Sequence, residues 1–387
     1  MFSNICAEGI FGYNMKRINL SEPSLDQLEE EALLNVLNSG WLTQGPKVKQ
    51  FEEEFSEFIG RPSLAVSSCT AALHLAHLIC GAKTGLEVIV PSLTFVATPN
   101  TVRYTGADVV FADIKSIDDW TIDPESVASK ISEQTVGITV MHYAGYAADM
   151  KKFADISKNF GIYLVEDACH GLGGSFEGRA LGTFGDVSCF SFYGNKIMTT
   201  GEGGMMVFQN PELVEIASSL RSHGMTNLAW DRVLGALSYN VSALGYNYRM
   251  DDLRASIGIA QLSKLKSFVK SRQKLVEIYK REIAQIDEIH VPTFGQKLES
   301  ANYIFPLLLK SGDRDAFRKK LDSKGVQTSV HYTPCHQFDS YNTANHSLPV
   351  TDYVGAKCFS LPLFSSMRES DVDFVCQTLQ DCARLSL

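Results

Sequence analysis

Two neighbouring stretches decide the fold: IYLVEDACHGLGG at Ile162–Gly174 and CFSFYGNKIMTTGEGGMMV at Cys189–Val207. In each, a short apolar run typical of a buried strand leads directly into polar residues and glycines. Ligands bind at the carboxyl ends of the strands in open α/β sheets. The pattern therefore predicts Asp167 at the carboxyl end of one strand and Lys196 in a polar turn between two others.

Strand-like and helix-like segments alternate from residue 60 to residue 210. Alternation of this kind predicts an α/β fold with a mainly parallel sheet, here of seven strands, between helices. The expected strands are Leu64–Val66, Glu87–Val90, Asp108–Ala112, Gly137–Met141, Ile162–Glu166, Val187–Phe192 and Met205–Phe208, and the expected helices include Thr70–Ile79, Pro124–Lys130 and Met150–Asn159.

The flanking segments predict further elements. Ser24 and Gln27 are expected to form a capping box at the start of a helix that Gly40 ends. Residues 251–286 are typical of one long helix. Beyond it, strands at Tyr303–Leu309, Val326–Tyr332 and Phe359–Leu361 and helices at Asp315–Leu321 and from Ser370 predict a smaller α+β domain.

These elements suggest three parts of the chain. Residues 1–16 are expected to be a lead-in, residues 17–255 the large α/β domain, and residues 256–387 the connecting helix with the small C-terminal α+β domain. A chain of 387 residues has room for two or three domains.

Composition excludes several classes of protein. The net charge of −9 argues against nucleic-acid binding, which normally leaves a basic footprint. No apolar run reaches the length of a membrane span, and no signal peptide is recognisable at residues 1–20. Nine cysteines without a CxxC pair favour a reducing compartment, so we expect a cytoplasmic protein.

Three groups of residues are candidates for chemistry. A partly buried lysine such as Lys196 loses its proton readily and becomes an amine nucleophile for carbonyl compounds. An unpaired carboxylate at a strand end favours a cationic partner, although capping of the next helix by Asp167 is an equal alternative. The stretch from Ser67 to Leu73 enters a helix through hydroxyl residues, which predicts either an anion site or simple capping by Ser68.

Two other motifs do not meet the requirements of the binding sites that they suggest. The glycines at 171–174 do not form a dinucleotide fingerprint, because Phe176 stands where a further glycine is required. His331, Cys335 and His336 share a segment, but no HExxH or paired CxxC accompanies them, so no metal site is expected.

Together these segments resemble the DegT/DnrJ/EryC1/StrS family of nucleotide-sugar aminotransferases, which have fold type I of the pyridoxal 5′-phosphate (PLP) enzymes. The likeness extends from about Asn19 to Phe364. The blocks that carry it are SGWLTQGPKVKQFEEEF (39–55), TFVATPNTV (94–102), VEDACHGLGG (165–174), FSFYGNKIMTTGEGG (190–204), LGYNYRMDDLRASIG (244–258), HYTPCH (331–336) and LPLF (361–364).

The resemblance implies roles for the residues around the cofactor ring. Lys196 matches the lysine that binds PLP covalently, and Asp167 matches the carboxylate that pairs with the pyridinium nitrogen. Phe95 falls where an aromatic ring stacks on the cofactor. His170 occupies a position that usually holds glutamine beside the cofactor's 3-oxygen.

It also implies a phosphate site and a dimer. Cys69, Thr70 and Ser191 match the residues around the phosphate, with Cys69 where glycine or alanine is commoner. Asn247 matches a residue that reaches the phosphate from a neighbouring subunit. The expected assembly is therefore a homodimer with shared active sites.

The implied reaction is an amino transfer from L-glutamate to a keto-sugar nucleotide, such as an NDP-4-keto-6-deoxyhexose or an NDP-3-keto sugar, in amino-sugar or polysaccharide biosynthesis. A cyclitol aminotransferase is an alternative. A PLP-dependent or pyridoxamine-dependent sugar dehydratase is disfavoured, because such relatives carry histidine in place of Lys196. No DNA-binding segment supports the further alternative of a cofactor-binding regulator.

Overall fold

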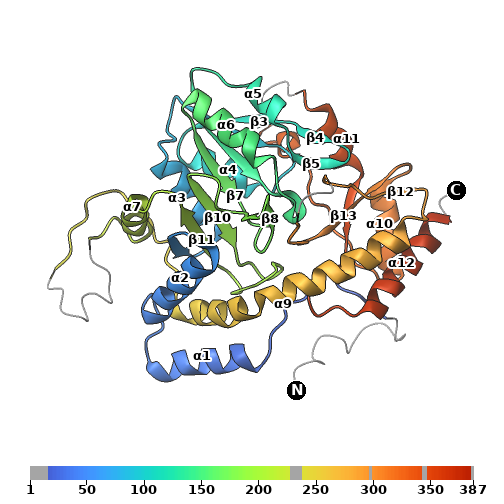
Figure 1. Ribbon diagram of the computed structural model, residues 1–387, viewed down its shortest axis with the longest axis horizontal. Coiled ribbons are helices and arrows are strands. Elements are labelled where there is room, and N and C mark those ends of the chain that lie inside the picture. The colour runs from blue at the N-terminus through green and yellow to red at the C-terminus, as the bar shows by residue number, and fades with distance from the viewer. Residues whose placement is uncertain (1–15, 227–237, 296–298, 342–346, 385–387) are drawn as a thin grey trace.

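The computed structural model of the chain describes residues 16–226, 238–295, 299–341 and 347–384. The expected lead-in lies outside the described residues, apart from Lys16. At the centre is a seven-stranded sheet in the order β1-β11-β10-β7-β6-β2-β3 (Figure 1). Every strand runs in one direction except β11, which is antiparallel to β1 and β10. The strands are β1 (Ser63–Val66), β2 (Glu87–Pro91), β3 (Asp108–Ala112), β6 (Thr135–Met141), β7 (Tyr163–Asp167), β10 (Val187–Ser191) and β11 (Gly204–Phe208).

Successive strand residues point to opposite faces of this sheet. Apolar side chains lie on both faces, and helices cover both. In β7, Leu164 packs in a cluster with Phe153, whereas Val165 packs with Leu73. The α/β fold with a mainly parallel sheet is thus confirmed, and all seven expected strands are present. The covering helices are α2 (Pro46–Ile59), α5 (Pro124–Ala128) and α6 (Met150–Phe160) on one face, and α3 (Cys69–Ile79), α4 (Ala97–Tyr104) and α7 (Glu212–Arg221) on the other.

The first helix, α1 (Gln27–Ser39), has a different cap from the expected one. The capping box is formed by Asp26 and Glu29, so the prediction of Ser24 and Gln27 is wrong. The Asp26 carboxylate accepts the Leu28 amide at 2.9 Å, and the Glu29 carboxylate accepts the Asp26 amide at 2.8 Å. Carboxylates suit this position better, because both also contact the ammonium group of Lys264 on the neighbouring helix.

That neighbouring helix, α9 (Asp252–Ile283), crosses the whole molecule (Figure 1). Asp251 caps it by accepting the Arg254 amide at 2.9 Å. The buried side chain of Asp252 accepts the amides of Gly45 and Val48, and so caps α2 from a distance. One acidic pair at the start of α9 therefore fixes two helices at once.

The C-terminal part contains a small antiparallel sheet, β12 (Ile289–His290), β13 (Phe305–Leu309) and β14 (Cys358–Leu361). A separate apolar cluster forms around it, with Tyr279 of α9 stacked on Phe305 at 4.8 Å between ring centres. The domain division at residue 255 remains a prediction. The helices of this part are α10 (Arg314–Ser323), α11 (Pro349–Lys357) and α12 (Glu369–Arg384).

The strand expected at Val326–Tyr332 does not form, and the prediction is wrong. Only single bridges are present, between Ile18 and Val326 and between Ser329 and Ser360. Backbone groups that a ladder would pair are bound by side chains instead: the Thr328 carbonyl accepts a hydrogen bond from Arg318 at 3.0 Å.

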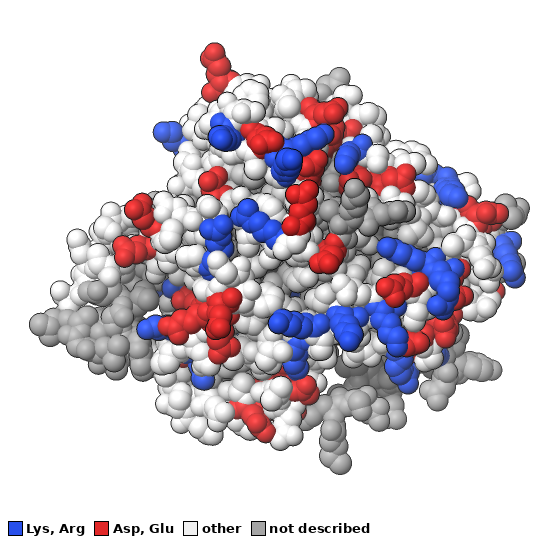
Figure 2. Space-filling view, viewed as in Figure 1, with Lys and Arg blue, Asp and Glu red and all other residues white. Residues whose placement is uncertain are grey.

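Among the described residues, no helix is long and apolar enough to cross a membrane. On the face shown in Figure 2, basic and acidic side chains are interspersed. Smaller elements that the sequence analysis did not predict are the hairpins β4 (Ile114–Ser116) with β5 (Asp119–Ile122), and β8 (Ser175–Phe176) with β9 (Arg179–Ala180).

Candidate active site

A cavity of about 570 Å³ opens at the carboxyl ends of β7 and β10. Parallel pairing places Asp167 opposite Cys189, so that Ser191 lies at the same edge of the sheet. Six of the eight predicted site residues line this cavity: Cys69, Thr70, Phe95, Asp167, Ser191 and Lys196. The structure thus brings together residues that lie more than a hundred positions apart in the chain.

The Asp167 carboxylate is buried, with 2% of the residue exposed. It accepts the Thr98 hydroxyl at 2.7 Å and the Cys169 amide at 3.3 Å. These two donors fix the orientation of the carboxylate and leave it further lone pairs for a ligand. A cationic group in the cavity would complete its environment.

The neighbouring Glu166 points away from the cavity and acts as a buried anchor. Its carboxylate accepts hydrogen bonds from His142 at 2.8 Å and from the Ser188 hydroxyl at 2.9 Å. Hydrogen bonds from His142 and from the backbone lower the pKa of Glu166 even though burial alone would raise it. The carboxylate also accepts the amides of Gly182, Phe184 and Gly185, which ties β7 to the loop before β10.

Lys196 follows β10 in a turn closed by its own amide, which donates to the Tyr193 carbonyl at 2.9 Å. Its ammonium nitrogen lies 4.1 Å from the ring centre of Tyr303. Burial alone would lower the pKa of Lys196, but Tyr303 and the thiols of Cys169 and Cys69 raise it above its usual value. The net direction of the Lys196 pKa is therefore upward, and it gives no support to the expectation that burial frees the amine.

The first turn of α3 shows the expected capping by Ser68, and the anion site there remains a prediction. Ser68 caps the helix by accepting the Ala71 amide at 3.1 Å. Cys69 and Thr70 border the cavity, and amides of a first helical turn have no partner within the helix. A Cβ at Gly204 would lie 2.7 Å from the Cys69 amide nitrogen, so only glycine permits this close approach of β11. Burial raises the pKa of the Cys69 thiol, which makes it a poor nucleophile.

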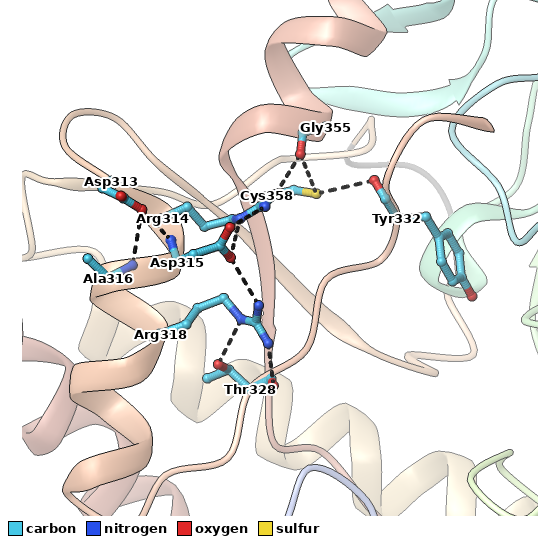
Figure 3. Close-up of polar contacts among 9 residues, drawn as sticks. All are labelled: Asp313, Arg314, Asp315, Ala316, Arg318, Thr328, Tyr332, Gly355 and Cys358. Atoms are coloured by element: carbon cyan, nitrogen blue, oxygen red, sulfur yellow. Dashed lines mark hydrogen bonds and ion pairs between the residues drawn. The ribbon is translucent and has the colours of Figure 1, made fainter. Parts of the chain in front are cut away.

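The opposite side of the cavity is formed by residues 329–332, which we call the C-terminal wall. Figure 3 shows how it is held from behind. Arg318 donates to the Thr328 hydroxyl at 3.2 Å and to its carbonyl, while the Cys358 thiol faces the carbonyls of His331 and Tyr332. The Tyr332 ring points away from this network, and its centre lies 6.0 Å from that of Phe95.

Two predicted site residues do not line the cavity of this chain. His170 is 1% exposed and lies behind the C-terminal wall, where its Nε2 contacts the Tyr332 hydroxyl at 2.9 Å. Asn247 is exposed, and its backbone forms a single bridge with Ser222. Neither residue therefore contributes a side chain to the cavity within one chain.

Several lining residues were not among the predicted site residues. Tyr303 and Asn195 are joined by a hydrogen bond of 3.0 Å beside Lys196. Thr98 orients Asp167 but does not itself line the cavity. Asn195 adjoins Lys196, a signal that could have found it, whereas Tyr303 gives no signal inside an apolar strand-like run. Among the described residues, no group of three or more histidine, cysteine or acidic side chains could hold a metal ion.

Solved structures similar to this chain include those of aminotransferases. The solved structure of the aminotransferase TlmJ from Streptoalloteichus hindustanus matches with a TM-score of 0.90 and 34% identity, over 96% of this chain and all of that one. Spr1654 from Streptococcus pneumoniae, described as a sugar aminotransferase and solved in its PLP form, matches with a TM-score of 0.89 and 27% identity over 96% of this chain and all of that one. GDP-perosamine synthase from Escherichia coli O157:H7 is 32% identical over 95% of this chain and 99% of its own.

The fold and the cavity, seen with these likenesses, define a PLP-dependent sugar aminotransferase. The model of the DegT/DnrJ/EryC1/StrS aminotransferase family matches residues 23–380, and the chain belongs to this family.

The residues present fit PLP. A phosphate requires unpaired donors, which the first turn of α3 supplies close to the backbone of Gly204. A protonated pyridine nitrogen requires a buried carboxylate with spare lone pairs, which Asp167 supplies. An amine for covalent attachment is present as Lys196 in the same cavity.

Proposed function

We propose that this enzyme moves the amino group of L-glutamate onto a keto-sugar carried by a nucleoside diphosphate, either an NDP-4-keto-6-deoxyhexose or an NDP-3-keto sugar. The observation that supports the proposal best is that Lys196, Asp167 and the first turn of α3 border one cavity. The full-length match to GDP-perosamine synthase supports a nucleotide-linked sugar as the acceptor.

Four side chains and the first turn of α3 would hold the cofactor in this proposal. Lys196 binds it through Nζ, and the Asp167 carboxylate holds a proton on the ring nitrogen. Phe95, half exposed on the cavity side, covers one face of the ring. Ser191 joins the first turn of α3 in binding the phosphate. The bound cofactor supplies an electron sink for the carbanion that forms at the donor's Cα.

Lys196 also moves the proton of the reaction. With PLP bound, a free Lys196 amine beside the donor would take the proton from the donor's Cα.

A homodimer completes the site in this proposal. Asn247 is exposed and lies between Tyr246 and Tyr248, whose rings stack at 5.1 Å. From this position the amide of Asn247 would reach the phosphate bound by a partner subunit.

The decisive experiment incubates the enzyme with PLP, L-glutamate and a panel of keto-sugar nucleotides, and follows amination by mass spectrometry. Amination of a nucleotide-linked keto-sugar is expected. Turnover of a free keto-inositol alone would identify a cyclitol aminotransferase and contradict the proposal.

The shared site has its own test. Asn247→Ala is expected to weaken PLP affinity roughly tenfold, because a hydrogen bond to a charged phosphate is lost. Asn159→Ala, a change at an exposed position of α6, serves as the control. Equal PLP affinity in both variants would contradict a phosphate contact across the dimer.

A further inference from the structure

The buried side chain of His170 has a defined hydrogen-bonding state. The Ala144 amide donates to His170 Nδ1 at 3.3 Å, so this nitrogen carries no proton. Burial, with further contributions from Lys196, His331 and His142, lowers the pKa of His170 well below its usual value. The ring is therefore neutral, and its one proton is on Nε2.

This state determines the direction of the next hydrogen bond. His170 Nε2 lies 2.9 Å from the Tyr332 hydroxyl. Because Nε2 carries the proton, His170 donates and the Tyr332 oxygen accepts. The hydroxyl proton of Tyr332 is then available, and no other described residue lies within hydrogen-bonding distance of it. Tyr332 lines the cavity, whereas His170 does not.

The other cavity tyrosine differs in this respect. Tyr303 uses its hydroxyl proton on the side-chain oxygen of Asn195, at 3.0 Å. The backbone of Tyr332 is also held in place (Figure 3). The Cys358 thiol contacts the Tyr332 carbonyl oxygen, and Arg318 donates a hydrogen bond to the carbonyl of Thr328, four residues earlier. The Tyr332 oxygen accepts a hydrogen bond from His170, its proton has no acceptor among the described residues, and its backbone is held in place. The hydroxyl is therefore preorganised to donate a hydrogen bond into the cavity.

We propose that Tyr332, oriented by His170, donates its hydroxyl proton to the phenolic oxygen of the PLP ring, and that His170 acts through Tyr332 without touching the cofactor. This inference rests on the proposed cofactor site. It assigns to Tyr332 the contact that sequence resemblance gave to His170. His170 is then a positioning residue, and Tyr332 is the residue that binds the ring oxygen.

The surroundings of Tyr332 make its donor role the favoured one. Burial raises the pKa of the Tyr332 hydroxyl well above its usual value, so the phenol keeps its proton. A proton donated to an anionic ring oxygen makes that oxygen less basic. Without this hydrogen bond, the bound cofactor should lose its proton at a higher pH. Among the described residues, titratable groups from several elements lie near Tyr332: His170, Tyr303, Cys169, Tyr143, Asp167, His331 and Cys358.

The test measures PLP affinity and the pH midpoint of the bound cofactor's absorbance in the full-length enzyme. Tyr332→Phe is expected to weaken PLP binding roughly tenfold and to raise the midpoint by about one pH unit, since a hydrogen bond to a charged oxygen is lost. Tyr341→Phe is the matched control, because it removes a hydroxyl bonded to Asn100 outside the cavity lining.

Two substitutions at His170 distinguish a residue that orients the Tyr332 hydroxyl by a hydrogen bond from one that only fills the space behind it. His170→Gln can still accept the Ala144 amide and donate to Tyr332, so it should remain near the wild-type midpoint. His170→Leu should shift the midpoint as Tyr332→Phe does, and the double variant should shift it no further. Thermal unfolding of the protein without PLP reports whether each variant folds.

An unchanged midpoint in Tyr332→Phe would overturn the proposal, and so would a shift there with none in His170→Leu. If Tyr332→Phe does not fold, the contrast between His170→Gln and His170→Leu decides alone. A wild-type protein that binds no PLP would instead refute the proposed function, so the two failures are distinguishable.

Discussion

The two sides of the cavity are held in place by different means. The strand side, with Asp167 and Ser191, is fixed by the register of parallel strands and by the buried carboxylate of Glu166. The C-terminal wall has no ladder and depends on side chains such as Arg318 and Cys358 from elements outside the large sheet. Regular backbone pairing gives a rigid base for covalent chemistry, whereas a wall held by side chains can vary in sequence without disturbing the sheet.

The largest expected effect is on the strand side. Lys196→Arg should reduce amino transfer at least roughly thousandfold, because the guanidinium remains protonated and cannot attach PLP covalently. Steady-state kinetics and the absorbance of bound PLP measure the loss. The exposed control Lys83→Arg should retain activity. Retained turnover in Lys196→Arg would contradict the assignment of the covalent step to the strand side of the cavity.

Removal of the anchor below Asp167 should have the next largest effect. Glu166→Gln places an amide against donors from the backbone and from His142, and should lower the free energy of unfolding by about 3 kcal/mol. Urea unfolding measures the change, with the exposed Glu133→Gln as the control. A change below about 0.5 kcal/mol would mean that register alone holds the strand side.

The wall should respond more weakly and in a different property. Arg318→Ala removes both hydrogen bonds to Thr328 and should lower the free energy of unfolding by about 1–2 kcal/mol. We also expect KM for the keto-sugar to rise while kcat changes less, because residues 329–332 border the cavity without performing the covalent step. Lys319→Ala, at an exposed position of the same helix, is the control. An equal fall in kcat would indicate that the wall contributes to the chemistry itself.

The same contrast explains what the sequence could predict. Each strand of the large sheet is a short apolar run followed by polar residues, so Asp167 and Lys196 could be located from local pattern, whereas Ser191 was implied only by the family resemblance. The segment 326–332, which contains the C-terminal wall, is rich in β-branched and aromatic residues, and a strand was expected there. Its carbonyls are bound by Arg318 and Cys358, and contacts between residues so far apart in the chain leave no local pattern.

The position of His170 shows a second limit. Its place in the chain, three residues after Asp167, correctly indicated proximity to the site. Whether an imidazole faces the cavity or lies behind another side chain depends on packing against Tyr303 and Tyr332. Likewise, the direction of the Lys196 pKa depends on the neighbouring Tyr303, which no motif reveals.

The last comparison tests whether the two sides respond alike to acid. Burial, with a contribution from nearby cations, lowers the pKa of His331 in the wall to about 3, and burial together with His74 lowers that of His77 below the sheet to about 3. The unfolded chain binds protons below its histidine pKa of about 6.5 while the folded protein does not, so stability is full above that pH and falls as the pH decreases toward 3.

Each of these histidines should therefore account for about 2 kcal/mol of the stability lost between pH 7 and pH 5. Urea unfolding at both pH values of His331→Asn and His77→Asn measures this, and comparing each variant with itself cancels the cost of the substitution. If the wall and the sheet unfold together, both variants should lose about 2 kcal/mol less than the wild type between the two pH values. A smaller loss in His77→Asn alone would show that the wall opens before the sheet, which is the behaviour expected of a surface held by side chains without a ladder.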